Sequence, residues 1–192
     1  GGRYEIMRAS IKKWCVGSPI QAILDATTEL VAQHQIAAAD VVKVTVTMPD
    51  DRIHIVDNRT MPDVCAQHLC ALAIVDGTVT FDSTHDHARM NDPAVLAVRQ
   101  KIDLLPSAEL TVARPARQAI VEITTSKGTF RHHARVVRGT PDNPMTASEI
   151  EAKALDLVAP IIGPERGAQL VETCRNLASL KSMRDLKPLL VA

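Results

Sequence analysis

The stretch QAIVEITTSKGTFRHHARVV, residues 118–137, decides the fold, because it predicts a β-hairpin. Side chains two positions apart share one face of a strand, so a half-buried strand shows a period of two. Both arms show this period, at Ala119, Val121 and Ile123 and then at Phe130, His132, Ala134 and Val136. The Ser-Lys-Gly sequence at 126–128 supplies the turn between them. The hairpin therefore predicts an antiparallel sheet.

A further strand is predicted upstream by VVKVTVTM, residues 41–48, where the even-numbered residues from Val42 to Met48 are all apolar. The Pro-Asp-Asp sequence that follows predicts a turn into a weaker alternating piece around Ile53 and Ile55. Residues 103–117 contain prolines and are predicted to be irregular, apart from a short strand at 110–112.

Helical spacing of apolar residues predicts a helix over residues 19–35. Ser18 is the predicted N-cap, and Gln21, three residues later, completes a capping box. Two more helices are expected at 62–75, where Asp76-Gly77 follows the helix end, and from Asp92-Pro93 to about residue 101.

The character of the sequence changes at RGTPDNPMTASE, residues 138–149, where prolines mark a linker. Thr146 and Glu149 have the spacing of a second capping box. Helices are predicted at about 147–160 and 164–179, with a short turn near 182–186. The predicted fold is therefore an α+β unit, with a small, mostly antiparallel sheet, followed by C-terminal helices.

The composition excludes several classes of protein. Lys+Arg and Asp+Glu number 22 each and aromatic residues make up 2%, so we expect no nucleic-acid partner. No apolar run approaches the length of a membrane span, and no signal peptide is recognised. Four scattered cysteines favour reduced thiols and a cytoplasmic location. Because the chain opens on GGRYEIMRAS without an initiator methionine, we expect a piece of a longer polypeptide.

Lys12 and Lys13 precede Trp14, the single tryptophan, shortly before the predicted helix start at Ser18. A lysine pair is often solvated surface. The functional alternative is that an ammonium group and the positive end of the helix together favour a carboxylate ligand. Gln21 is already explained by the capping box.

His68 lies on the apolar stripe of the predicted helix 62–75. An inward-facing histidine is either a hydrogen-bonded core residue or a group that transfers protons, and the sequence leaves both open.

The segment CAQHLC, residues 65–70, and the nearby His85 and His87 raise the alternative of a zinc-binding regulatory module. Cys65 and His68 share a helical face, but Cys70 is predicted to point elsewhere and no CxxC pair is present. We therefore expect no metal site. His132 and His133 alternate across a strand and cannot form a pair.

Four segments, in this order, carry a family resemblance: IKKWCVGSPIQAILDA, NRTMPDVCAQHLCALAIVDGTVTF, HDHARMNDPAVLAVRQKI and VRGTPDNPMTASEIEAKALDL. Together they resemble the C-terminal part of the MmgE/PrpD family, over roughly residues 3–180. This family includes 2-methylcitrate dehydratase, cis-aconitate decarboxylase and iminodisuccinate epimerase.

The resemblance implies a division of the chain into three parts. Residues 1–12 would link two domains, residues 13–140 would form an α+β lid, and residues 141–192 would be a helical tail. The tail would pack on a helical domain contributed by the N-terminal half of longer family members. The resemblance also implies a cofactor-free lyase or isomerase for small di- or tricarboxylates, usually a homodimer.

The resemblance further implies roles for individual residues. Lys12 matches a family lysine that reaches the active-site cleft, where it would hold a carboxylate or stabilise an enolate. His68 occupies the position of a tyrosine in many relatives and would donate or accept a proton. Lys13, Ser18 and Gln21 are expected to contact substrate, although many relatives have histidine at the position of Gln21.

The family's acidic and histidine catalytic residues from the helical domain have no counterpart in these 192 residues. We therefore expect this piece alone to be inactive. The alternative function is a non-catalytic domain that binds small carboxylates or a partner subunit.

Overall fold

The computed structural model describes residue 2 and residues 4–191. The chain forms two compact units, Gly1–Pro144 and Met145–Ala192. Their assignment to a lid and a helical domain remains a prediction from the resemblance.

In the part of the chain that the structure describes, four strands of the first unit form one sheet in the order β2-β1-β3-β4. The strands are β1 (Val41–Pro49), β2 (Ile102–Ser107), β3 (Ala119–Thr125) and β4 (Gly128–Ala134). β1 pairs in parallel with β2 and antiparallel with β3, and β3 pairs antiparallel with β4. The predicted α+β class with a mostly antiparallel sheet is confirmed.

The hairpin that the sequence predicted is β3 and β4, with Ile123 opposite Phe130 and Val121 opposite His132. The predicted face of β1 is wrong at its first position, because Val41 is buried whereas Val42 is 61% exposed. A register shift between Val41 and Lys43 turns the start of the strand, and the alternation then follows the prediction from Val44 onward.

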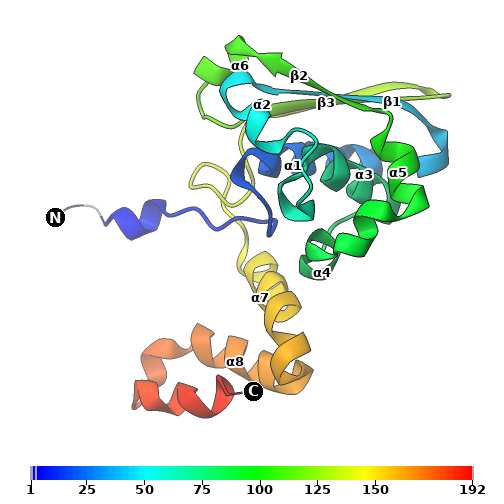
Figure 1. Cartoon of the computed structure of the whole chain (residues 1–192). Helices are drawn as coiled ribbons and strands as arrows, with labels where there is room; N and C mark the ends of the chain where they lie inside the picture. The colour runs from blue at the N-terminus through cyan, green and yellow to red at the C-terminus, as the bar shows by residue number, and fades with distance from the viewer. Residues whose placement is uncertain (1, 3, 192) are drawn as a thin grey trace. The chain divides into compact units, whose positions relative to one another are not determined.

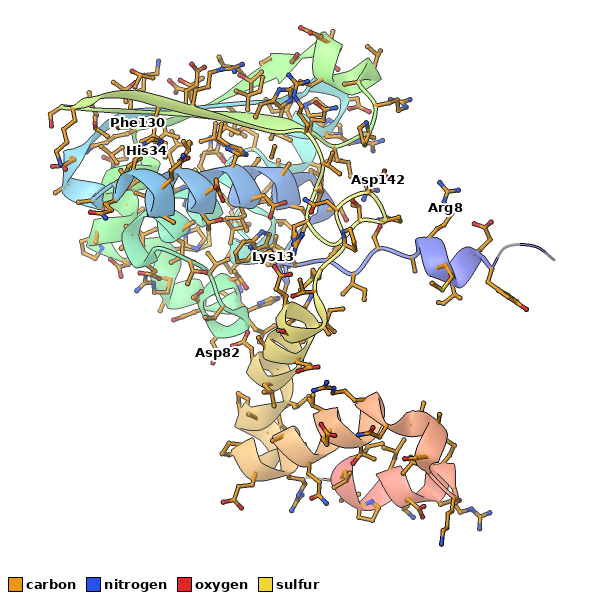
Figure 2. The ribbon with its side chains drawn as sticks, turned by 180° about the vertical axis from the view of Figure 1, so that it is seen from behind. Arg8, Lys13, His34, Asp82, Phe130 and Asp142 are labelled. Atoms are coloured by element: carbon orange, nitrogen blue, oxygen red, sulfur yellow. The ribbon has the colours of Figure 1, made fainter. Side chains whose placement is uncertain are left out.

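Two long helices, α1 (Gln21–His34) and α3 (Ala66–Asp76), pack against each other beneath the sheet. Figure 1 shows them with α5 (Pro93–Arg99) on one side of the strands. The core lies between these layers, with Ile23 and Leu30 of α1 fully or almost fully buried. At the far end of α1, the ring of His34 stacks on Phe130 of β4, with centroids 4.2 Å apart (Figure 2). The helix therefore spans the hairpin.

The predicted C-terminal end of α3 and the predicted start of α5 are confirmed, whereas α3 begins at Ala66 and not at residue 62. Gly77 follows α3 in the left-handed conformation, and the side chain of Asp92 caps α5 by accepting hydrogen bonds from Ala94 and Val95. Between them lie two elements that the sequence analysis missed, the capped turn α4 (Phe81–His85) and the 3-10 helix η5 (His87–Asn91).

Two segments differ from their prediction. The piece around Ile53 and Ile55 is a helix, α2 (Asp50–Val56), because Asp50 and Asp51 occupy its first turn, where acidic residues are favourable. Residues 103–117 are not irregular throughout: they contain most of β2, and the expected strand at 110–112 is part of the helix α6 (Ala108–Val112). Pairing with the free edge of β1 makes β2 a strand despite Pro106.

Short 3-10 helices complete the first unit: η1 (Glu5–Arg8), η2 (Ser18–Ile20), η3 (Ala38–Asp40) and η4 (Pro62–Val64). No helix of the described residues has both the length and the apolar character needed to cross a membrane.

The second unit is helical, as its sequence predicted. It consists of α7 (Ala147–Ile162), α8 (Pro164–Arg175), η6 (Leu177–Ser179) and η7 (Met183–Leu189). The predicted capping box at Thr146 and Glu149 is present, with each side chain bonded to the other's backbone N–H. α7 and α8 pack on each other, yet α7 has no fully buried residue.

Candidate functional site

A cavity of about 160 Å³ lies next to the first turn of α1. The incoming segment, residues 9–17, and the outgoing segment, residues 136–143, border it together with the loop before β3 that carries Ala116 and Arg117. Among the lining residues are Lys12, Ser18 and Gln21, three of the residues that the sequence analysis proposed. The cavity also includes Arg117 and Arg138, which that analysis did not single out.

The lining of this cavity is positively charged. Lys12, Arg117 and Arg138 contribute cations from three separate segments, and no aspartate or glutamate is among the lining residues. The ammonium of Lys12 donates a hydrogen bond to the carbonyl oxygen of Val16, 3.1 Å away. The guanidinium of Arg138 donates to Oδ1 of Asn143 at 2.7 Å. These bonds hold two of the cations at the cavity, and the arrangement suits a small anion.

Gln21 orders the incoming segment rather than capping the helix, so the predicted capping box with Ser18 is wrong. Its Oε1 accepts the Trp14 backbone N–H at 3.2 Å, and its Nε2 donates to the Trp14 carbonyl oxygen at 2.9 Å and to that of Val16 at 3.3 Å. Ser18 lies in the 3-10 turn η2, and no side chain caps α1. The amide of Gln21 is consumed by these buried bonds, which leaves the cations to bind a ligand.

Asp25, one turn after Gln21, joins both segments to α1. Its Oδ1 accepts the indole N–H of Trp14 at 2.9 Å, and its Oδ2 accepts the backbone N–H of Arg138 at 2.8 Å. Burial raises the pKa of Asp25 above its ordinary value, and the bonds from Arg138 and Trp14 partly oppose that shift. Asp25 therefore supports the cavity wall without lining it.

The two segments touch directly at Gly139. Its carbonyl oxygen accepts the backbone N–H of Ile11 at 2.8 Å. Its φ is +90°, and a Cβ added there would lie 1.8 Å from the carbonyl oxygen of Ile11. Only glycine fits at this contact between the two segments. Lys12 follows Ile11, so the contact positions Lys12 at the cavity.

Lys13 does not line the cavity. Its ammonium lies 4.3 Å from the centre of the Trp14 ring, in a cation–π contact. Figure 2 labels it on the segment that leads into α1. The structure thus separates the two lysines, with Lys12 at the cavity and Lys13 on the indole.

His68 lies within α3, is fully buried and is not among the residues that line the cavity. Neither ring nitrogen has a hydrogen-bond partner among the described residues. Burial, assisted by the positive charges of Arg99 and Arg89, lowers its pKa to about 4. The imidazole is therefore neutral at pH 7. It can accept a proton, but it lacks the additional proton that an imidazolium would donate.

No group of three metal-binding side chains of the His, Cys, Asp or Glu type was found among the described residues. Cys65 and Cys70, from the segment considered for zinc, are both buried, and the Cys70 sulfur lies 3.4 Å from the Thr27 hydroxyl oxygen. Burial raises the pKa of the Cys70 thiol to about 11, which disfavours the thiolate that zinc needs.

The family model of the MmgE/PrpD C-terminal domain matches residues 14–177. The chain belongs to the MmgE/PrpD family. A search of curated proteins finds no match to the chain. The matched range of the MmgE/PrpD domain includes Ser18, Gln21 and His68 and begins just after Lys12 and Lys13.

Sequence reasoning about this MmgE/PrpD domain missed Asp25, Arg117, Arg138 and Gly139. A signal for Asp25 was available, because it follows Gln21 by four residues and shares its helical face. Arg117 and Arg138 carry no such local signal, since the incoming segment that completes the cavity is about a hundred residues away in the sequence.

Proposed function

We propose that this MmgE/PrpD C-terminal domain serves a lyase or isomerase that acts on small di- or tricarboxylates. The observation that carries the proposal is the cavity lined by Lys12, Arg117 and Arg138 without an acidic side chain. Three cations in a small space favour a ligand with more than one negative charge.

The proposed chemistry takes place at a carbon next to a carboxylate, from which a proton, carbon dioxide or water departs. Negative charge then develops on the substrate, and a fixed cation stabilises that charge more in the transition state than in the ground state. Lys12 is the proposed cation, because its ammonium is held at the cavity by the Val16 carbonyl.

His68 is the proposed proton acceptor, because its neutral imidazole has no hydrogen-bond partner among the described residues. This role requires a path between the substrate and a ring that is buried inside α3. For that reason the roles of Lys12 and His68 are tested separately. Ser18 and Gln21 line the cavity, whereas Lys13 lies outside it on the Trp14 ring and has no role in the proposal.

The chemistry needs a cation and a proton acceptor, both of which side chains supply, so the proposal includes no cofactor. A cytoplasmic location is proposed because all four cysteines are free. A homodimer is also proposed. Its basis is an apolar groove between α7 and α8, which a second copy would cover and which is lined by Ile150, Val158, Leu170 and Val171.

The second candidate is a non-catalytic domain that only binds carboxylates or a partner. The specific observation that favours it is the burial of His68 away from the cavity. Binding without proton exchange would support this candidate.

The test uses the protein that contains this domain, incubated in D₂O with a panel of di- and tricarboxylates. Nuclear magnetic resonance detects deuterium at the carbon next to a carboxylate, or loss of water or carbon dioxide. Lys12→Ala should lower the rate by roughly 10²-fold, as does removal of one oxyanion-stabilising donor. Lys13→Ala is the matched control and should cost little. Equal losses in both variants, or no reaction with any member of the panel, would contradict the proposal.

A further inference from the structure

Arg117 lies at the cavity with an unusual backbone. Its φ is +68°, in the left-handed region that residues other than glycine seldom adopt. Such a conformation costs about 1–3 kcal/mol and persists where the surroundings hold it, often at ligand-binding positions.

The neighbour of Arg117 shows what holds it. The side chain of Gln118 is buried, donates to the Pro115 carbonyl oxygen at 2.9 Å and pairs with Nε2 of His133 on β4 at 2.8 Å. The bond to Pro115 closes the loop around Arg117, and the bond to His133 joins the end of the loop to the sheet. The strained residue is therefore held firmly in place, although its own side chain is exposed.

The side chain of Arg117 differs from the other two cations of the cavity. Lys12 and Arg138 both donate hydrogen bonds to protein oxygens. For Arg117, no hydrogen bond or ion pair to any described residue is found. Its planar guanidinium can bind a carboxylate through two parallel N–H donors. A cation without a partner, held in a strained conformation at a cavity, is poised for a ligand.

The charge of the cavity indicates how many carboxylates that ligand carries. A monocarboxylate can contact one lining cation through its single charged group, whereas a dicarboxylate can span Arg117 and a cation from another segment. We infer that Arg117 binds a second carboxylate of the substrate and thereby selects di- over monocarboxylates. This inference rests on the proposed function, because it assumes that Lys12 receives the first carboxylate.

The test compares succinate with propionate, which is the same carbon chain without the second carboxylate. Binding of each to the full chain is measured by calorimetry at one ionic strength. The variant is Arg117→Asn, because asparagine tolerates the left-handed region and removes the guanidinium with its charge. Arg135→Asn is the control, since Arg135 is also an exposed arginine but does not line the cavity.

Arg117→Asn should lower the affinity for succinate by about 10-fold or more, the scale of a lost hydrogen bond to a charged group. Its affinity for propionate should stay within about twofold, and Arg135→Asn should leave both ligands unaffected. Arg117→Lys should restore part of the succinate affinity, because lysine returns the positive charge but not the two parallel N–H donors of the guanidinium. The thermal midpoint of Arg117→Asn should equal or exceed that of the parent.

Two results would overturn the inference in different ways. If the parent binds both acids and Arg117→Asn weakens both equally or neither, the role of Arg117 is wrong while the proposed carboxylate function stands. If the parent binds neither acid, the proposed carboxylate function fails and the role of Arg117 fails with it.

Discussion

The indole N–H of Trp14 donates a hydrogen bond to Oδ1 of Asp25 over 2.9 Å, across eleven residues of sequence. The other oxygen of the same carboxylate accepts the backbone N–H of Arg138 at 2.8 Å. One side chain of α1 thus fixes both the incoming and the outgoing segment at the cavity.

Replacing Asp25 by Ala should destabilise the first unit by about 2 kcal/mol, because the Trp14 indole and the Arg138 backbone N–H both lose their acceptor. Urea unfolding monitored by fluorescence of the single tryptophan measures the change. Glu29→Ala is the control on the same helix, since Glu29 is exposed. A loss no larger than that of the control would show that Asp25 does not hold the segments.

Gly139→Ala should cost far more stability than Gly77→Ala. Both glycines have positive φ, +90° and +77°, so both variants suffer similar backbone strain. Only at Gly139 does the added Cβ meet an atom, the carbonyl oxygen of Ile11. The difference in unfolding free energy should exceed about 2 kcal/mol, on the scale of overpacking. Equal losses would mean that the two segments do not cross as described.

Gln21→Ala should cost more stability than Ser18→Ala. A capping box would predict a substantial loss for Ser18→Ala, because Ser18 would be the N-cap. Gln21 makes three buried hydrogen bonds to Trp14 and Val16, so its loss should cost about 2 kcal/mol. Ser18 caps nothing, so its replacement should stay within about 0.5 kcal/mol. Thermal unfolding of both variants measures the contrast, and a larger loss for Ser18→Ala would restore the capping interpretation.

His68 should make the first unit less stable as the pH falls from 6.5 to about 4. In this window the unfolded chain binds a proton at His68 and the folded chain does not, because the folded pKa is about 4. Lowering the pH therefore favours unfolding, by up to about 1.4 kcal/mol per pH unit. Above pH 6.5 this contribution to stability is fully present.

In His68→Phe this part of the pH profile should disappear, whereas replacement of the exposed His87 by Ala should leave the profile unchanged. In the protein that contains this domain, His68→Phe should also lower turnover by about 10²–10⁴-fold if His68 accepts the proton. Stability that changes while turnover stays intact would make His68 a core histidine.

Amide hydrogens of α7 should exchange faster than those of β1 and β3. α7 has no fully buried residue and contains Pro160, and Ile161 is 70% exposed. Mass spectrometry of peptides after exchange measures this difference. If a second copy covers the apolar groove, protection of α7 should rise with protein concentration. Equal protection of α7 and the strands in dilute protein would contradict the prediction.

Local patterns were sufficient to predict the hairpin, α3, α5 and the capping box at Thr146. Each depends on residues within one turn or one pair of arms, such as Asp92 before α5 or the alternation from Ala119 to Ile123. The segment at 50–56 was misassigned, because Ile53 and Ile55 alternate locally, whereas the acidic first turn and burial of Val56 favour a helix.

The candidate site was predicted in part. Lys12 was recognised through the resemblance and lies at the cavity, but Lys13 and His68 do not line it. The amide of Gln21 was assigned to a capping box because that motif has the right spacing, yet its partners are Trp14 and Val16. Spacing alone does not show which backbone groups a buried amide reaches.

By itself, the sequence determined the α+β class, the family and the positions of the longest helices, since hydrophobic period and capping act within a few residues. Only the tertiary structure decided that residues 102–107 form a parallel edge strand and that Arg117 and Arg138 meet Lys12 at one cavity. Both outcomes depend on segments far apart in the chain, which the packing of α1 and α3 against the sheet brings together. Contacts of that kind leave no periodic trace in the sequence.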